Sequence, residues 1–128
     1  MIHFDAIFLV DDDPINNLIN NRLLNKVKVT EQIEEFLEGQ FAIDRISELP
    51  VDHKILIFLD INMPVMNGWE FLEIYQERFI ERNDKIIILS SSIDFQDRQK
   101  AQEFSIVSDF LEKPLTLDKI QNQIDKYQ

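Results

Sequence analysis

The chain has 128 residues, of which 45% are hydrophobic and 29% charged, as expected for one globular domain with a single hydrophobic core. Its net charge of −11 argues against direct binding to nucleic acid. It contains no cysteine, which excludes disulfides, thiolate zinc sites and cysteine nucleophiles.

Neither a signal-peptide pattern nor an apolar run long enough to span a membrane occurs in the sequence. Asp5 interrupts the N-terminal apolar stretch, and no basic region precedes it. No run approaches the roughly 18 apolar residues of a membrane span. We therefore expect a cytoplasmic protein without membrane insertion.

Short β-branched runs alternate with helical patterns along the chain, which predicts a parallel sheet covered by helices on both faces. The first strand is predicted over residues 5–10. The first helix is predicted to begin at Pro14 with Asp13 as its N-cap, because an acidic cap before a proline favours a helix start. Its apolar residues recur at helical spacing, namely Ile15, Leu18, Ile19 and Leu23.

The remaining elements continue this alternation to the C-terminus. We predict strands near 31–36, over 54–60, 85–90 and 107–111, and helices over 41–46, 69–80, 95–103 and from Leu117 through Ile120, Ile124 and Tyr127. Right-handed crossovers between such elements predict an α/β fold of the flavodoxin-like, doubly wound kind. Its five-stranded parallel sheet would have the order 2-1-3-4-5, with five helices. Gly68 is expected to supply a positive φ in the turn after Pro64.

Acidic residues close two of the predicted strands. Asp11 and Asp12 follow the first strand directly, and Asp60 closes the third. In the order 2-1-3-4-5 these two strand ends are neighbours at the edge where open α/β sheets keep their chemistry. Like charges about 4 Å apart cost on the order of 4 kcal/mol at an effective dielectric of roughly 20. A cation is therefore expected among the three carboxylates.

The same edge is predicted to hold hydroxyls and an ammonium group. The fourth strand ends in Ser90-Ser91-Ser92, and Lys113-Pro114 follows the fifth. A metal ion and a lysine that offset negative charge, together with a hydroxyl donor, are what phosphoryl transfer requires. Asp60 would then be the nucleophile and would form an acyl phosphate.

Together these residues resemble the receiver domain of two-component response regulators. The resemblance is carried by Val10-Asp11-Asp12, Asp60 with Met63-Pro64 and Gly68, Ser90 followed by Ser91, and Lys113-Pro114. It covers the whole chain and implies a single, stand-alone receiver domain over residues 1–128 that is similar to chemotaxis regulators.

The resemblance implies a function in a phosphorelay. Asp60 would accept a phosphoryl group from a histidine kinase or histidine phosphotransfer protein, and the domain would signal to an unknown partner protein through its fourth helix, fifth strand and fifth helix. Phosphorylation and dephosphorylation of Asp60 itself would be its only catalysis, and a monomer or weak dimer is expected. Kinase specificity is predicted to lie on the first helix near the acids, on Asn16, Asn17, Asn20, Asn21 and Arg22.

The resemblance also implies which residues bind metal. Mg²⁺, or Mn²⁺, would be bound by Asp12, Asp60 and the backbone carbonyl of Asn62, with Asp11 acting through water. Oxygen ligands with retained waters are what Mg²⁺ prefers.

By the same resemblance, further residues would serve the phosphoryl group and the conformational switch. Ser90 and Lys113 would contact the phosphoryl group, and Phe110 would occupy the aromatic switch position together with Ser90. Phenylalanine replaces the family's tyrosine there, so packing alone would carry the signal. Asn62 and Ser92 lie where the family tunes its rate of dephosphorylation.

Two alternatives remain open from the sequence. Asp11-x-Asp13 after an apolar strand also resembles the opening motif of haloacid dehalogenase-like phosphatases, which would make Asp11 the nucleophile of a hydrolase. The chain could also be a pseudo-receiver, a binding module that works without phosphorylation. Structural roles are expected for the helical aromatic residues and for Asp13, and no catalytic role is expected for His3 or His53.

Overall fold

The computed structural model describes residues 4–30, 32–91 and 94–127. Its strands are β1 (Ala6–Val10), β2 (Ile33–Phe36), β3 (Ile55–Leu59), β4 (Lys85–Ser90) and β5 (Val107–Glu112). Its helices are α1 (Pro14–Val27), α2 (Gly39–Ser47), α3 (Gly68–Arg78), α4 (Phe95–Gln102) and α5 (Leu117–Lys126). Every predicted element is present with bounds within two residues of the prediction, except that Glu31 lies outside the described residues.

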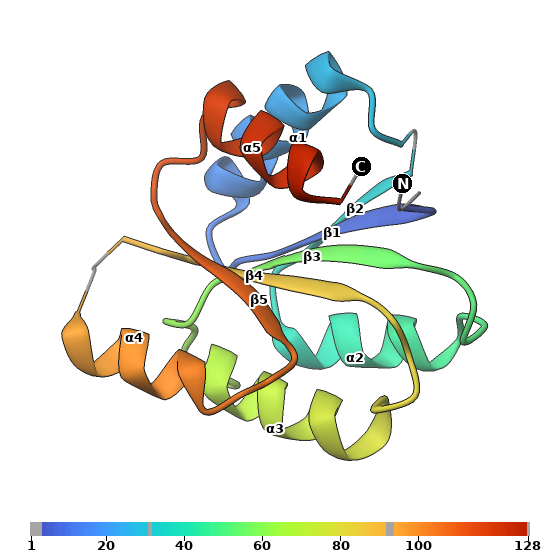
Figure 1. The fold of residues 1–128 in the computed structure, drawn as a ribbon, viewed down its shortest axis with the longest axis vertical. Helices are drawn as coiled ribbons and strands as arrows, with labels where there is room; N and C mark the ends of the chain where they lie inside the picture. Colours follow the sequence, from blue (N-terminus) through green and yellow to red (C-terminus); the bar gives the residue numbers. More distant parts are fainter. Residues whose placement is uncertain (1–3, 31, 92–93, 128) are drawn as a thin grey trace.

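The five strands form one parallel sheet in the order β2-β1-β3-β4-β5, which confirms the predicted flavodoxin-like doubly wound fold. Figure 1 shows α1 and α5 on one face of the sheet and α2, α3 and α4 on the other. Each face has its own apolar core. All residues of β1 and β3 are buried, as central strands covered on both faces require. No helix in the described ranges has the length and apolar character needed to cross a membrane.

The register of the sheet brings the functional strand ends to one level. Val10 pairs with Leu59, so Asp11 and Asp60 follow at the same edge, and Ser90 pairs with Glu112, next to Lys113. The backbone N–H of Asp60 donates to the carbonyl of Val10 at 2.9 Å. These pairings fix the spacing of the site through the backbone.

Helix α1 is oriented differently from what its apolar spacing suggests. Asp13 caps it as predicted, accepting hydrogen bonds from the backbone N–H groups of Ile15 and Asn16. Its outward face, however, carries the exposed apolar residues Ile15, Leu18 and Ile19. The buried residues of the helix are Asn17, Asn20 and Leu24. Asn17 is tolerated inside because its Nδ2 donates to the carbonyl of Asp11 at the end of β1.

The prediction for Gly68 is wrong, because no described glycine has a positive φ. Gly68 is the first residue of α3, and a Cβ there would lie 2.7 Å from the Cα of Ile61 and 2.9 Å from the carbonyl oxygen of Asp60. Its N–H donates to the carbonyl of Ile61 at 2.8 Å. The glycine therefore allows α3 to approach the backbone that follows Asp60.

Candidate functional site

The three predicted acids converge at the carboxyl edge of the sheet. One carboxylate oxygen from each of Asp11, Asp12 and Asp60 lies within 4.8 Å of the others. Asp11 and Asp60 are buried, whereas Asp12 is exposed. Oxygen-only donors of this kind fit a hard divalent cation such as Mg²⁺.

Lys113 reaches this acidic cluster from the loop after β5. Its Nζ lies 2.8 Å from Oδ2 of Asp11 and 3.6 Å from Oδ2 of Asp60. Its backbone N–H donates to the carbonyl of Ser90 at 2.7 Å, which extends the β4–β5 pairing up to the site. Lys113 therefore offsets part of the acidic charge in this structure.

Burial and charge shift the pKa values of the site in a consistent direction. Burial raises the pKa of Asp60 from its ordinary 3.8 to about 6; Lys113 opposes this rise and the charge of Asp11 adds to it. Burial would lower the pKa of Lys113, but its hydrogen bond to Asp11 and the charges of Asp11 and Asp60 raise it. A nearby positive charge would therefore stabilise the ionised form of Asp60.

Two further predicted residues of the phosphoryl site, Asn62 and Ser90, lie on segments next to Asp60. The backbone N–H of Asn62 donates to Oδ1 of Asp60 at 3.2 Å, and the Asn62 side chain is exposed. Ser90 is buried at the end of β4, the strand beside that of Asp60. Ser92 lies outside the described residues.

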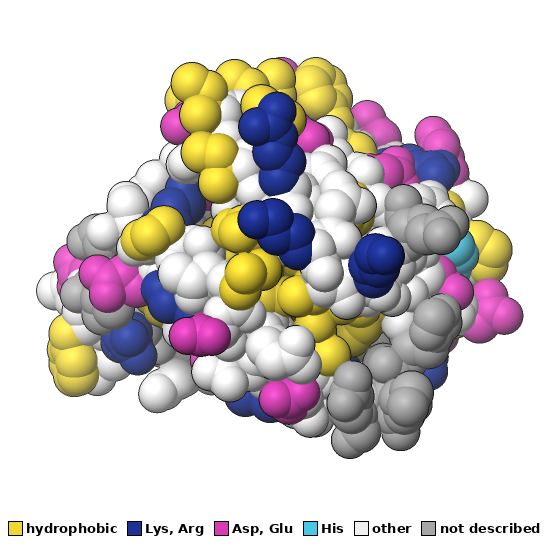
Figure 2. Space-filling view, turned by 90° about the horizontal axis from the view of Figure 1, so that it is seen from above, with side chains coloured by type: hydrophobic (Ala, Val, Ile, Leu, Met, Phe, Trp, Pro, Cys, Tyr) yellow, Lys and Arg dark blue, Asp and Glu magenta, His cyan; other side chains and the backbone are white. Residues whose placement is uncertain are grey.

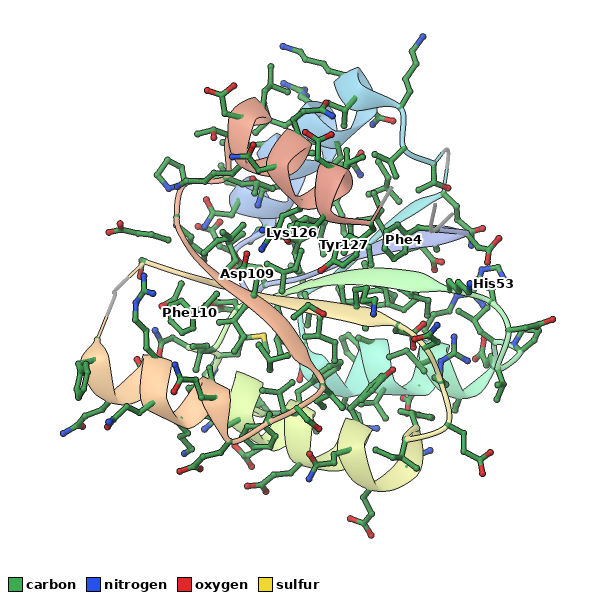
Figure 3. The ribbon with its side chains drawn as sticks, in the orientation of Figure 1. Phe4, His53, Asp109, Phe110, Lys126 and Tyr127 are labelled. Carbon is green, nitrogen blue, oxygen red and sulfur yellow. The ribbon has the colours of Figure 1, made fainter. Side chains whose placement is uncertain are left out.

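Phe110, the predicted switch residue, is half-buried on β5 beside β4, opposite Ile88. Its ring packs against the core, with the guanidinium carbon of Arg98 on α4 at 5.3 Å from the ring centroid. The preceding Asp109 bonds instead to Lys126 and Gln123 of α5 (Figure 3). Adjacent residues of β5 therefore contact α4 on one side and α5 on the other.

The structure corrects the prediction that kinase specificity resides on Asn17 and Asn20. Both are buried, and Nδ2 of Asn17 donates to the carbonyl of Asp11 at 2.9 Å. The other three predicted residues, Asn16, Asn21 and Arg22, remain wholly or partly exposed. The bond from Asn17 to the backbone of Asp11 was not predicted from the sequence. The available signal was an amide on the helix directly after the acids, out of phase with the apolar residues.

His53 lies in the turn before β3, at the opposite edge of the sheet from the acids, as predicted (Figure 3). His3 lies outside the described residues. The aromatic residues Trp69, Phe71 and Tyr75 of α3 are buried in the core, which agrees with their predicted structural role.

Comparison with known proteins assigns this geometry to a family. The sequence model of the response regulator receiver domain matches residues 7–125. The chain belongs to the response regulator receiver domain family. A crystal structure of a two-component response regulator from Cytophaga hutchinsonii superposes on this receiver domain with a TM-score of 0.84 at 31% identity, covering 98% of this chain and 97% of that one. A response regulator receiver protein from Dyadobacter fermentans gives a TM-score of 0.86 at 26% identity, covering 95% and 96% of the two chains.

Curated relatives place similar domains in proteins of very different length. The receiver domain is 30% identical to part of hybrid signal transduction histidine kinase L from Dictyostelium discoideum, over 94% of this chain but 7% of that protein. It is 29% identical to two-component response regulator 24 from Arabidopsis thaliana, over 92% of this chain and 80% of that protein. The chain thus spans a small part of some relatives and most of others.

Proposed function

We propose that this chain, as a single receiver domain over residues 1–128, accepts a phosphoryl group on Asp60 from the phosphohistidine of a histidine kinase or histidine phosphotransfer protein. The observation that carries the proposal is the position of Asp60, which is buried beside two further carboxylates and 3.6 Å from the ammonium of Lys113. An acyl phosphate formed there would have the ammonium of Lys113 as a counter-charge, together with any metal ion held by the carboxylates. The membership of the receiver family supports the same acceptor.

The transfer exchanges one bond to phosphorus for another. A carboxylate oxygen of Asp60 attacks the phosphorus, the O–P bond forms, the N–P bond to the donor histidine breaks, and the imidazole leaves with the electron pair. Lys113 pairs with a phosphoryl oxygen, and Ser90 donates a hydrogen bond to another. Asp11, Asp12, Asp60 and the carbonyl of Asn62 would hold the metal. When bound, Mg²⁺ or Mn²⁺ supplies the positive charge that offsets the phosphoryl oxygens.

The reverse reaction, hydrolysis of the acyl phosphate, is proposed to be the only other catalysis of the domain. Asn62 borders the acceptor through its backbone bond to Asp60. Its side chain is exposed, so it can influence the approach of water to the phosphoryl group. Asn62 and Ser92 are therefore proposed to set the lifetime of the phosphorylated form.

The donor protein is proposed to dock on the outer face of α1, in a cytoplasmic setting. Ile15, Leu18 and Ile19 are 65%, 46% and 50% exposed and begin directly after the acidic residues. Figure 2 looks onto the α1–α5 layer and shows hydrophobic side chains gathered beside Lys and Arg side chains. Apolar contact would supply affinity, and Asn16, Asn21 and Arg22 around it would supply specificity.

The signal is proposed to reach a partner protein through the surface formed by α4, β5 and α5. Phosphorylation adds charge beside β4, draws Ser90 toward the phosphoryl group and lets Phe110 turn inward. Because β5 contacts both α4 and α5 around Phe110, the movement would change a surface read by a partner protein. The domain would act as a monomer or weak dimer.

Phosphorylation with acetyl phosphate and Mg²⁺, followed by mapping of the adduct by mass spectrometry, tests the proposal. We expect label on Asp60 and none in Asp60→Asn, while Lys113→Ala accepts label but signals poorly to its partner. Label on Asp11 with multiple turnover would favour the phosphatase alternative. A chain that takes up neither Mg²⁺ nor label would be a pseudo-receiver.

A further inference from the structure

The buried face of α1 places two amide side chains directly beneath the acidic cluster. Asn17 is 0% exposed, and Asn20 is 8% exposed. The apolar residues that would ordinarily occupy such a face point outward instead. Burying an amide costs free energy unless its donors and acceptors are paired. The two buried amides of α1 are therefore expected to have hydrogen-bond partners.

The amide of Asn17 is only half paired. Its Nδ2 donates to the carbonyl of Asp11 at 2.9 Å and lies 3.5 Å from the carbonyl of Phe36, joining α1 to the ends of β1 and β2. Its Oδ1 is buried and accepts no hydrogen bond from the described part of the chain. An unpaired buried acceptor has lost its hydration without compensation, and a small polar ligand would restore the missing hydrogen bond.

A cavity of about 10 Å³ is lined in part by Asn17. Its polar lining consists of Asp11, Asn17, Asn20 and Asp60, and the remaining walls are apolar residues of β1, β3 and β4. A cavity of roughly 10–15 Å³ with two to four polar partners holds one water molecule. The cavity has room for one water molecule, and an amide oxygen is a good acceptor for a water hydrogen.

We propose that Asn17 and Asn20 form an internal binding site for one water molecule beneath the acidic cluster, and that this amide–water unit fixes the end of β1 that carries Asp11. The water donates a hydrogen bond to Oδ1 of Asn17 and bonds to the amide of Asn20. Asn17 holds the backbone of Asp11 directly, and the water supports Asn17 from the other side. Both amides are positioning residues, and this positioning role rests on the proposed metal site.

Crystallography of the wild-type chain and of two variants tests the water site. We expect an ordered water within hydrogen-bond distance of Asn17 Oδ1 in the wild type. Asn20→Leu should fill the cavity and displace this water while leaving the Asn17–Asp11 bond in place. Asn17→Leu removes both the bond and the water, and Asn25→Leu, an exposed asparagine on the same helix, is the matched control.

Calorimetric titration with Mg²⁺ tests the positioning role. Loss of a group that orients a metal ligand costs on the order of tenfold in affinity, so the dissociation constant should rise about tenfold in Asn17→Leu and less in Asn20→Leu. It should not change in Asn25→Leu. If Asn17→Leu fails to fold, Asn20→Leu alone decides the outcome.

A wild-type structure without water at Asn17 overturns the site, and unchanged Mg²⁺ affinity in the folded variants overturns the positioning role. Neither measurement involves phosphorylation. A chain that never accepts a phosphoryl group on Asp60 would refute the proposed function and leave both of these results standing.

Discussion

Lys113 lies closer to Asp11 than to the proposed acceptor, with its Nζ 2.8 Å from Oδ2 of Asp11 and 3.6 Å from Oδ2 of Asp60. The ammonium therefore offsets the charge of the proposed metal-binding carboxylates in this structure. A phosphoryl group on Asp60 would offer it new acceptors within a short movement of a flexible side chain. Lys113 would thus pair with the acids in the unphosphorylated domain and with the phosphoryl group in the proposed phosphorylated form.

Replacing Lys113 by methionine should destabilise the domain and strengthen metal binding. Without the ammonium, the buried acids lose their nearest positive charge, so the free energy of unfolding in metal-free buffer should fall by about 2 kcal/mol. Added Mg²⁺ should restore part of this loss and bind more tightly than in the wild type, because no fixed charge opposes it. Urea denaturation with and without Mg²⁺ measures both effects. Lys126→Met, which removes a half-exposed ion pair with Asp109, should cost no more than about 1 kcal/mol.

Asp60→Asn should stabilise the metal-free domain at alkaline pH. The folded-state pKa of Asp60 is raised from 3.8 to about 6, so its contribution to stability is fully present below pH 3.8 and is lost as the pH rises through about 6. Asparagine avoids the buried charge, and the gain at pH 8 should approach about 3 kcal/mol. The difference between variant and wild type should shrink as the pH falls from about 6 to 3.8, as measured by thermal or urea unfolding.

The control for this pH dependence is Asp52→Asn, an exposed carboxylate in the turn at the opposite edge of the sheet. Its stability should follow that of the wild type at every pH. A stability gain of Asp60→Asn that is independent of pH would contradict burial of the ionised carboxylate as the cause.

Asp12→Asn should weaken stabilisation by Mg²⁺. At a Mg²⁺ concentration of 100 times the dissociation constant, binding to the folded state adds about 2.7 kcal/mol. Loss of one of the three clustered carboxylates should cut this increment at the same Mg²⁺ concentration, as measured by the shift in Tm. Asp13→Asn is the matched control, because Asp13 caps α1 and asparagine keeps the capping acceptor. Equal losses in the two variants would argue against a metal site at Asp12.

Arg82→Met should cause the largest loss of stability away from the site. The Arg82 and Asp84 side chains are 3% and 0% exposed and pair at 2.7 Å. Arg82 also donates to three carbonyls of the α2–β3 connection, those of Leu49, Pro50 and His53. Breaking a buried pair from one side costs about 3–5 kcal/mol, because the remaining charge stays buried.

The control for Arg82→Met is Arg45→Met, since the Arg45–Glu34 pair is of similar length, 2.8 Å, but its side chains are 32% and 26% exposed. A partly exposed pair contributes about 0–1 kcal/mol. The two variants should therefore separate clearly in urea denaturation, and equal losses would show that burial does not set the cost.

Ile19→Lys should impair phosphotransfer from a protein donor and leave chemical phosphorylation intact. Ile19 is exposed on α1, so the lysine is accommodated without loss of core packing, but it places a charge in the proposed docking face. The rate of transfer from a phosphorylated histidine kinase active on the wild type should fall about tenfold or more, with an unchanged rate from acetyl phosphate. Phe41→Lys, at an exposed apolar residue of α2, should change neither rate.

The amino-acid sequence by itself determined the element order, the sheet topology and the acidic edge. The apolar runs before Asp11 and Asp60 could only be central parallel strands, and right-handed crossovers then left the order in which their ends are neighbours. The same strand order predicts that Ser90 and Lys113, at the ends of the fourth and fifth strands, lie at the acidic edge. Local chemistry also fixed the start of α1, since an aspartate before a proline satisfies the free N–H groups of a helix.

Only the tertiary structure decided which face of α1 is buried and what Gly68 does. Helical spacing identifies an apolar stripe but does not say whether the stripe contacts the sheet or the solvent. In α1, Asn17 is buried and donates to the carbonyl of Asp11, whereas Ile15 is exposed. The position of Gly68 after Pro64 predicts a turn residue, whereas in the structure it allows a close approach of α3 to the backbone after Asp60. Both outcomes depend on contacts between segments that are distant in sequence. Local spacing carries no information about which groups of the sheet or of the following loop a helix will contact.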